Sequence, residues 1–355
     1  MKRDKNLKFI VFKCALNINS GLGHIKRCII VAKLISSKFT PLFIVPDYAK
    51  SYIKIIVKNK LNFKQLPKSA NLLEEVKYYP TNTCGVVIDI ADNLHRSNRK
   101  LFYNYLNSLT KHKFMAVLFD GMFEDCIFTE DHPAISLIIK PYVGAEKDKI
   151  PLNTPVIGGS DYVIIGNEYI NNKNFKYKNN SKRVLITLGG SDPTEVTTWI
   201  LNSLKSDLNN SSDYLISVII GPYFTHSQIE KIKSFYDIFP NIKFIYNPES
   251  LLNFYISNDI VLLGSGANSR YEAASCGKPC IGVGILKEHD HQCFLNSGKG
   301  GFNYLGFYRE VRPKIFCNTI KKILLDDEKH KSLSEASRKL INGTGSRKIA
   351  KKIEN

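Results

Sequence analysis

The sequence has no cysteine spacing that is typical of a metal site. Its eight cysteines include no Cys-x-x-Cys pair and no cysteine–histidine spacing of a zinc site. Several lie in apolar runs, as Cys276 and Cys280 do, which indicates reduced thiols packed in a core and a cytoplasmic protein. His289 and His291 are separated by one residue on an irregular segment, which is weak evidence for a metal. We therefore expect no bound metal.

Long apolar runs are also absent. No window approaches the roughly 20 apolar residues that a membrane-spanning helix needs. The apolar run after the basic segment 1–5 is interrupted by Lys13 and Asn17, so it is too short and too broken for a signal peptide. We expect a soluble monomer without an integral membrane segment, whose only membrane contacts would be peripheral.

Acidic residues are scarce, with 32 Asp and Glu against 50 Lys and Arg, for a net charge of +18. This charge fits an anionic partner, such as nucleic acid, a membrane surface or a phosphorylated substrate. It also fits a general preference for lysine on the surface. The lysines are spread along the chain, and no cluster of aromatic and basic residues is present. Nucleic acid is therefore not the expected partner, and a few local cations suffice for a diphosphate.

Short apolar runs alternate with helical patterns along the whole chain. Continuous apolar strands between helices are typical of parallel sheets covered on both faces. We expect an α/β protein with two doubly wound, Rossmann-like domains, residues 1–170 and 183–340, and a ligand cleft between them. A polar linker over 171–182 and a C-terminal helical tail over 341–355 complete this organisation, and the chain is expected to be helical from about Pro313. The predicted strands are 9–16, 42–45, 85–89, 114–120, 183–188, 214–220, 242–246, 259–263 and 279–283.

The first of three glycine-rich loops contains Gly21, Gly23 and His24, just before a helix predicted over 25–37. Glycines let a ligand approach the backbone closely, and a helix N-terminus attracts anions. Histidine titrates near neutral pH, and a helix N-terminus disfavours its charged form, so His24 is a candidate general base. A tight turn with a histidine near the helix cap is the alternative, since the third glycine of a dinucleotide-binding fingerprint is absent.

The second loop, Gly189-Gly190-Ser191-Asp192-Pro193, opens the second predicted domain. Its glycines and hydroxyl resemble a phosphate-cradling turn, but the Gly-Lys-Ser/Thr of a P-loop is missing. Asp192 is a candidate helix N-cap, and Pro193 suits a first helical turn. We assign Gly190, Ser191 and Asp192 to the substrate site, with an ordinary strand-to-helix turn as the alternative.

The third loop, residues 264–268, precedes a helix that ends at a glycine C-cap signal. Gly266, Ala267 and Asn268 are small enough for a ligand to lie against the helix start. Glu272 falls about one turn into the helix, where its two oxygens can accept hydrogen bonds from both hydroxyls of a ribose. A buried or capping glutamate is the alternative. Farther on, Gln292 is a candidate for contacting a sugar or phosphate.

This third loop, together with Asp290-His291-Gln292, resembles the nucleotide-sugar site of GT-B glycosyltransferases related to the N-acetylglucosaminyltransferase of peptidoglycan synthesis. The string GLGHIKR at 21–27 is similar to the signature of the UDP-sugar hydrolases of pseudaminic acid synthesis, a branch of that superfamily. Those hydrolases also carry segments similar to GGSDY at 158–162 and GGSDP at 189–193. The resemblance runs from about residue 9 to 310.

The resemblance implies a GT-B fold and hydrolysis of a UDP-linked 2,4-diacetamido-trideoxyhexose at its C1–O bond, without a metal or cofactor. By this resemblance His24 activates or positions the water, and Glu272 holds the ribose. Arg27 either offers positive charge or is structural. The full set of substrate-binding candidates is Gly21, Gly23, Lys26, Arg27, Asp89, Gly190, Ser191, Asp192, Gly266, Ala267, Asn268, Glu272 and Gln292.

Two segments depart from those hydrolases where the sugar would bind. Their Asp-His-Tyr segment reads Asp89-Ile90-Ala91 here, and a following pair of aspartates is reduced to Asp120-Gly121. These departures favour a second hypothesis, a GT-B glycosyltransferase in which an acceptor hydroxyl replaces water. A basic nucleic-acid-binding or nucleotide-sensing protein is the third hypothesis, motivated by the net charge.

Overall fold

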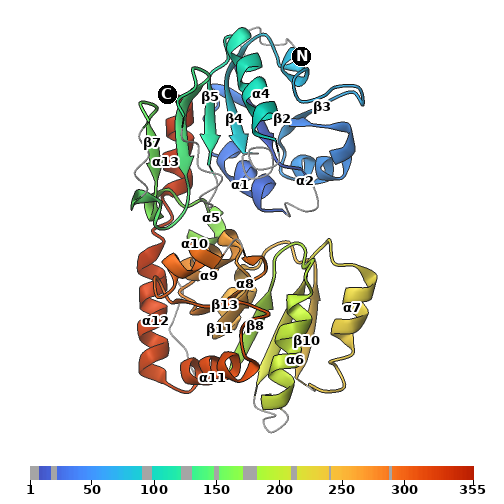
Figure 1. Cartoon of the computed structure of the whole chain (residues 1–355), viewed down its shortest axis with the longest axis vertical. Coiled ribbons are helices and arrows are strands. Elements are labelled where there is room, and N and C mark those ends of the chain that lie inside the picture. The colour runs from blue at the N-terminus through green and yellow to red at the C-terminus, as the bar shows by residue number, and fades with distance from the viewer. Residues whose placement is uncertain are drawn as a thin grey trace. The chain divides into compact units, whose positions relative to one another are not determined.

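The computed structural model describes residues 8–16, 22–89, 98–120, 130–147, 152–170, 182–208, 214–239, 241–287 and 290–355. The chain forms two compact units, one of residues 1–164 with 344–355 and one of residues 165–343. Figure 1 shows each unit as a sheet covered by helices. The predicted linker, 171–182, lies almost wholly outside the described residues.

The first unit is built on a seven-stranded parallel sheet in the order β3-β2-β1-β4-β5-β6-β7. The central strands are continuous apolar runs that are buried on both faces, as parallel strands between helical layers must be. The edge strand β3 is exposed throughout and is held by its pairing with β2. The strands are β1 Lys8–Cys14, β2 Phe39–Val45, β3 Asn62–Gln65, β4 Thr83–Asp89, β5 Ala116–Phe119, β6 Ile135–Lys140 and β7 Val156–Gly158.

Helices cover this sheet and bury one apolar face each. In α4, the side chains of Phe102, Leu106 and Leu109 recur at helical spacing and are fully buried. The last helix of the chain, α13, returns to this unit and contacts α1, burying Ile349 (Figure 1). The helices are α1 Gly23–Ala32, η2 Asp47–Tyr52, α2 Ile53–Lys58, η3 Glu75–Tyr78, α4 Arg99–Lys111, η5 Ala145–Lys147, η6 Ser160–Tyr162 and α13 Gly345–Glu354.

The second unit has a six-stranded parallel sheet in the order β10-β9-β8-β11-β12-β13. Helix α11 begins at Pro313, as expected from the sequence, because proline suits the first helical position. The strands are β8 Arg183–Thr187, β9 Leu215–Ile220, β10 Ile242–Tyr246, β11 Ile260–Leu263, β12 Cys280–Gly284 and β13 Phe302–Phe307. The helices are α5 Asn167–Ile170, α6 Val196–Leu208, α7 His226–Lys233, α8 Leu252–Ser257, α9 Ala267–Ser275, α10 Asp290–Asn296, α11 Pro313–Leu324 and α12 Asp327–Leu340.

Each sheet reverses its strand order at one place, between β1 and β4 in the first unit and between β8 and β11 in the second. Doubly wound sheets bind ligands at such a switch point, outside the carboxyl ends of the strands. Three of the four strands there are followed by the predicted glycine loops, and the fourth, β4, ends at Asp89. The fold therefore brings the predicted loops to the two switch points.

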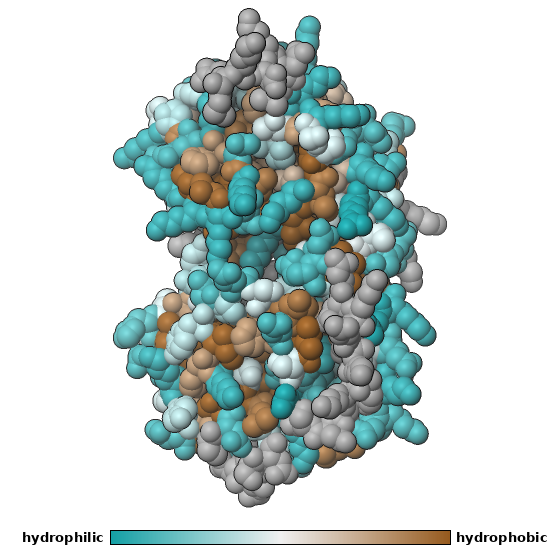
Figure 2. Space-filling model, turned by 180° about the vertical axis from the view of Figure 1, so that it is seen from behind, coloured by the Kyte–Doolittle hydropathy of each residue, from teal (hydrophilic) through white to brown (hydrophobic). Residues whose placement is uncertain are grey.

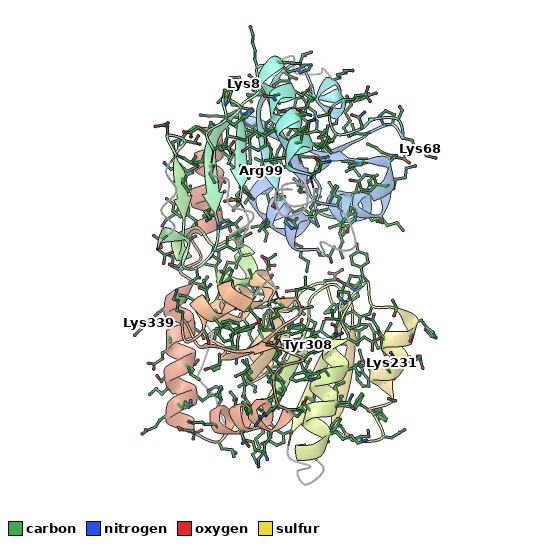
Figure 3. The ribbon with its side chains drawn as sticks, viewed as in Figure 1. Lys8, Lys68, Arg99, Lys231, Tyr308 and Lys339 are labelled. Atoms are coloured by element: carbon green, nitrogen blue, oxygen red, sulfur yellow. The ribbon has the colours of Figure 1, made fainter. Side chains whose placement is uncertain are left out.

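The excess of lysine is distributed over the surface. Lys8, Lys68, Lys231 and Lys339 come from different parts of the chain and are exposed (Figure 3). Hydrophilic side chains cover much of the face in Figure 2, with hydrophobic ones showing between them. Among the residues that the structure describes, no helix is both long and apolar enough to cross a membrane.

Candidate active site

His24, Arg27 and Asp89 meet at the switch point of the first unit. Asp89 is the last residue of β4, while His24 and Arg27 lie one turn apart on α1 and so share a face of the helix. His24 Nδ1 is 2.9 Å from Asp89 Oδ1. The guanidinium of Arg27 makes two hydrogen bonds to the same carboxylate. Nε donates to Oδ2 at 2.6 Å, and Nη2 donates to Oδ1.

The Asp89 carboxylate is ionised although its side chain is 1% exposed. Burial alone would raise its pKa, but the charges of Arg27 and His24 and their hydrogen bonds outweigh burial and hold the pKa well below its usual value. The thiol of Cys28 also donates to Oδ2 at 3.4 Å. Asp89 is therefore a fixed negative charge inside the unit.

The negative charge of Asp89 determines which nitrogen of His24 carries the proton. Nδ1 lies 2.9 Å from Asp89 Oδ1 and 3.1 Å from Arg27 Nη2. A carboxylate only accepts and a guanidinium only donates, so Nδ1 can satisfy one of them. An unprotonated Nδ1 would set its lone pair against the carboxylate. Nδ1 therefore carries the proton and donates to Asp89, and when the ring is neutral its lone pair is on Nε2.

Among the described residues, no side chain caps the N-terminus of α1, and its first turn has no acidic residue. Gly23 is the first helical residue and is partly exposed, and Lys26 is exposed. Gly21 lies outside the described residues. The helix start thus combines a histidine with the positive end of the helix dipole.

In the second unit, Asp192 caps α6 from the preceding loop. Its Oδ1 accepts from the backbone N–H of Val196 at 2.9 Å and its Oδ2 from that of Thr197 at 2.7 Å, and the side chain is buried. The helix begins at Val196, so the expectation that Pro193 lies in its first turn is wrong. Glu195, between them, has a φ of 55°, which is not a helical conformation. The positive end of α6 is therefore neutralised by the protein's own carboxylate.

Helix α9 has the opposite character. Its N-cap is Gly266, which makes no side-chain cap hydrogen bond, and its first turn has no acidic residue. A Cβ placed on Gly266 would meet nothing within 4 Å, whereas one on Gly264 would lie 2.5 Å from the Ile285 side chain. Ala267 and Asn268 are partly exposed beside it. This helix start is open to a ligand.

Glu272 lies farther along α9 and is partly buried. The hydroxyl of Tyr255 donates to its Oε2 at 3.2 Å. Burial, and then the charge of Glu272, raise the pKa of Tyr255 well above 10, so the phenol remains a donor. Tyr169 packs against Tyr255 with ring centroids 6.0 Å apart. Glu272 is thus a partly exposed carboxylate that a tyrosine hydroxyl helps to orient. This fits its predicted role as the acceptor of ribose hydroxyls.

The structure gives less on the other predicted residues. Gly190 and Ser191 are partly exposed in the loop after β8, and the Gly190 carbonyl accepts from the backbone of Tyr223 at 3.0 Å. The Gln292 side chain lies outside the described set. Within the described residues, no three His, Cys, Asp or Glu side chains are grouped as a metal site would require.

Sequence reasoning did not find two residues that shape these sites. Tyr142 accepts from Nη1 of Arg27, although the two are 115 residues apart. Gly221, after β9, is required because a Cβ there would lie 2.5 Å from the carbonyl oxygens of Gly189 and Gly190. Neither has a local signal, since each is defined by a partner that only the fold supplies.

No family model matches the chain. It is 22% identical over 328 residues to an uncharacterized protein of Methanocaldococcus jannaschii, covering 89% of this chain and 61% of that protein. It is 23% identical over 197 residues to the spore coat polysaccharide biosynthesis protein SpsG of Bacillus subtilis (54% and 56%). It is 28% identical over 174 residues to a UDP-N-acetylglucosamine–N-acetylmuramyl-(pentapeptide) pyrophosphoryl-undecaprenol N-acetylglucosamine transferase of Lactobacillus helveticus (48% and 46%). The chain thus spans 46 to 61% of the length of these curated relatives.

Solved structures share the fold over nearly the full length. MurG of Acinetobacter baumannii has a TM-score of 0.64 at 11% identity, covering 98% of this chain and 99% of that one. MnaA of S. aureus with UDP has a TM-score of 0.65 at 13% identity (98% and 96%). UDP-GlcNAc 2-epimerase of Neisseria meningitidis with UDP-GlcNAc has a TM-score of 0.61 at 12% identity (98% and 100%). These similarities confirm the expected fold, two parallel-sheet Rossmann-like domains of the GT-B type.

Proposed function

We propose that this protein is an enzyme that hydrolyses a UDP-linked amino sugar at the C1–O bond, releasing the free sugar and UDP. The observation that carries the proposal is the His24–Asp89 pair at the switch point of the first unit, 2.9 Å apart. It provides an imidazole in which Nε2 is the nitrogen that accepts a proton when the ring is neutral, which is the requirement for activating water. Two structural neighbours hold UDP or UDP-GlcNAc, and this supports the choice of substrate class.

In this proposal the second unit holds the nucleotide. The diphosphate binds at the N-terminus of α9, because that helix start is uncapped and Gly266 leaves room for phosphate oxygens. It does not bind at α6, whose N–H groups are already taken by Asp192. Glu272 accepts the ribose hydroxyls. In this proposal Asp192 therefore caps helix α6 and does not contact the substrate.

The chemical step needs a base and a stabilised leaving group. Nε2 of His24 takes one proton from water as the water oxygen forms a bond to C1 of the sugar. The bond between C1 and the phosphate oxygen breaks, and UDP leaves with the bonding electron pair. The backbone N–H groups of α9 stabilise the charge that develops on the diphosphate. A positioned base contributes on the order of 10²–10⁴-fold to such a reaction.

The sugar in this proposal is a 2,4-diacetamido-trideoxyhexose, and the pathway is nonulosonic acid or surface-glycan synthesis. The similarity of GLGHIKR at 21–27 to the hydrolase signature supports this choice. A relative is named for spore coat polysaccharide biosynthesis, which supports a role in surface glycans.

A glycosyltransferase is the second candidate. A relative is named as an N-acetylglucosamine transferase, and the Asp89-Ile90-Ala91 segment departs from the hydrolases. The same base can deprotonate an acceptor hydroxyl in place of water, so the site geometry fits both reactions.

The test is incubation with UDP-2,4-diacetamido-trideoxyhexoses and UDP-N-acetyl sugars without an acceptor, followed by chromatography of the products. Hydrolysis gives free sugar and UDP in equal amounts. His24→Ala should lower turnover on the order of 10²-fold or more and keep UDP affinity. His112→Ala, an exposed histidine of the same unit, is the matched control. Turnover only with an added acceptor would establish the transferase, and epimerised UDP-sugar without UDP release would contradict both candidates.

A further inference from the structure

Arg27 is bound within the protein rather than open to a ligand. Its side chain is 8% exposed. Nε and Nη2 donate to the two oxygens of Asp89, and Nη1 donates to the hydroxyl of Tyr142, which follows β6. The Arg27 guanidinium carbon also lies 5.8 Å from the centroid of the Tyr142 ring. The guanidinium is thus held on two sides by side chains from distant segments.

We propose that Arg27 and Tyr142 form a clamp that positions the His24 base, so that Arg27 is a positioning residue and not a phosphate-binding cation. This inference rests on the proposed function for its effect on turnover. The clamp acts through Asp89, which contacts both Arg27 and His24 through the same oxygen, Oδ1.

The clamp has two physical effects on Asp89. The first is on charge: burial raises the pKa of this carboxyl, and the Arg27 charge is the largest influence that lowers it. Without that charge the pKa of the buried carboxyl would rise, and the group would become a weaker acceptor for the proton on Nδ1. The second effect is on orientation. A guanidinium that donates two hydrogen bonds fixes the plane of the carboxylate, and the ammonium group of a lysine cannot do so.

Tyr142 fixes the clamp itself. An arginine side chain has several rotatable bonds, and the hydrogen bond from Nη1 to a buried phenol restricts them. Tyr142 is 7% exposed, so it is largely shielded from solvent. The series of contacts that sets the tautomer of His24 therefore runs from Tyr142 through Arg27 to Asp89.

The test reads the tautomer directly, by two-dimensional ¹⁵N NMR of the His24 ring in the full chain without substrate. The wild type should show Nδ1 protonated and Nε2 bare. Arg27→Lys keeps a charge but loses the fork, and Arg27→Gln loses both; in each, Nε2–H should appear, with kcat lower on the order of 10²-fold and KM within about threefold. Tyr142→Phe, which keeps the ring, should show the same change with a loss of about threefold to tenfold in kcat. Lys33→Gln, at the exposed residue that follows α1, is the matched control.

Two results would overturn the clamp. One is an unchanged His24 tautomer in folded Arg27→Gln or Tyr142→Phe. The other is a raised KM with kcat preserved, which would make Arg27 a substrate-binding cation. Because the NMR measurement needs no substrate, a wild-type protein that releases no sugar would refute the proposed hydrolysis while the clamp is still decided by the spectra.

Discussion

Replacing Gly266 with alanine separates the role of the α9 N-terminus in binding from its role in folding. Gly266 has a φ of −62° and a ψ of 126°, which alanine adopts without strain, and its Cβ would point into open space. The fold should therefore tolerate the methyl group. Gly→Ala at such a position stabilises a protein by about 0.4–1 kcal/mol, because the unfolded chain loses conformational freedom. For a unit the size of residues 165–343 this corresponds to a rise of about 1–4 °C in Tm.

Binding should change in the opposite direction. A methyl group at the helix N-cap occupies the space that a phosphate oxygen would need to reach the N–H groups of the first turn. Losing one charge-assisted hydrogen bond costs about 1.5–3 kcal/mol, which is a loss of about tenfold to a hundredfold in UDP affinity.

The assay is titration calorimetry with UDP, alongside thermal unfolding. Gly221→Ala is the matched control for folding, since its Cβ would lie 2.5 Å from the Gly190 carbonyl oxygen and should lower Tm. UDP affinity within twofold of wild type in Gly266→Ala would refute the placement of the diphosphate at the α9 N-terminus. A lowered Tm of this variant would refute the claim that a Cβ at residue 266 meets no neighbouring atom.

Three further predictions concern the second unit. Glu272→Ala should weaken UDP binding by about 1.5–3 kcal/mol through loss of a ribose acceptor, whereas Tyr255→Phe should have a smaller effect; calorimetry that ranks them the other way would contradict the assignment. Asp192→Ala should lower the free energy of unfolding by about 1–2 kcal/mol and leave UDP affinity nearly unchanged, and urea unfolding checks this; lost binding with intact stability would make it a substrate residue. Burial lowers the pKa of Lys278 from 10.5 to about 8, so between those values the unfolded chain binds a proton that the native chain lacks. Relative to Lys278→Met, the wild type should gain up to about 3 kcal/mol of stability as pH rises from 8 to 10.5, and parallel pH–stability curves would contradict this.

Most strands that are continuous apolar runs could be predicted, although β6, Ile135–Lys140, was not among the predicted strands. The predicted strands at 85–89 and 259–263 correspond to β4 and β11, because a strand buried on both faces carries its signal locally. Strand β3 was not among the predicted strands, since all four of its residues are exposed and only its pairing with β2 defines it. Strand β13 was also missed, because alternate residues are partly exposed and no apolar run forms.

For the candidate site, sequence patterns identified residues better than roles. Asp89 and His24 were both singled out, and their pairing across 65 residues depends on the parallel register of β1 and β4. Asp192 fitted both a cap and a substrate contact, and only the positions of the Val196 and Thr197 N–H groups favour the cap. A local pattern fixes which chemistry a side chain offers, and tertiary structure fixes where that chemistry is directed.

The return of α13 to the first unit means that the second unit is a covalent insertion within the first. The chain leaves the first unit after residue 164 and re-enters it at 344. Cutting the chain at residue 164 would therefore not give two independent proteins: the N-terminal fragment would lack the helix that covers part of α1, and the other fragment would carry that helix with Ile349 uncovered. Separate production of the first unit would require residues 344–355 to be joined back to it, through a short linker after residue 164 or through a circular permutation.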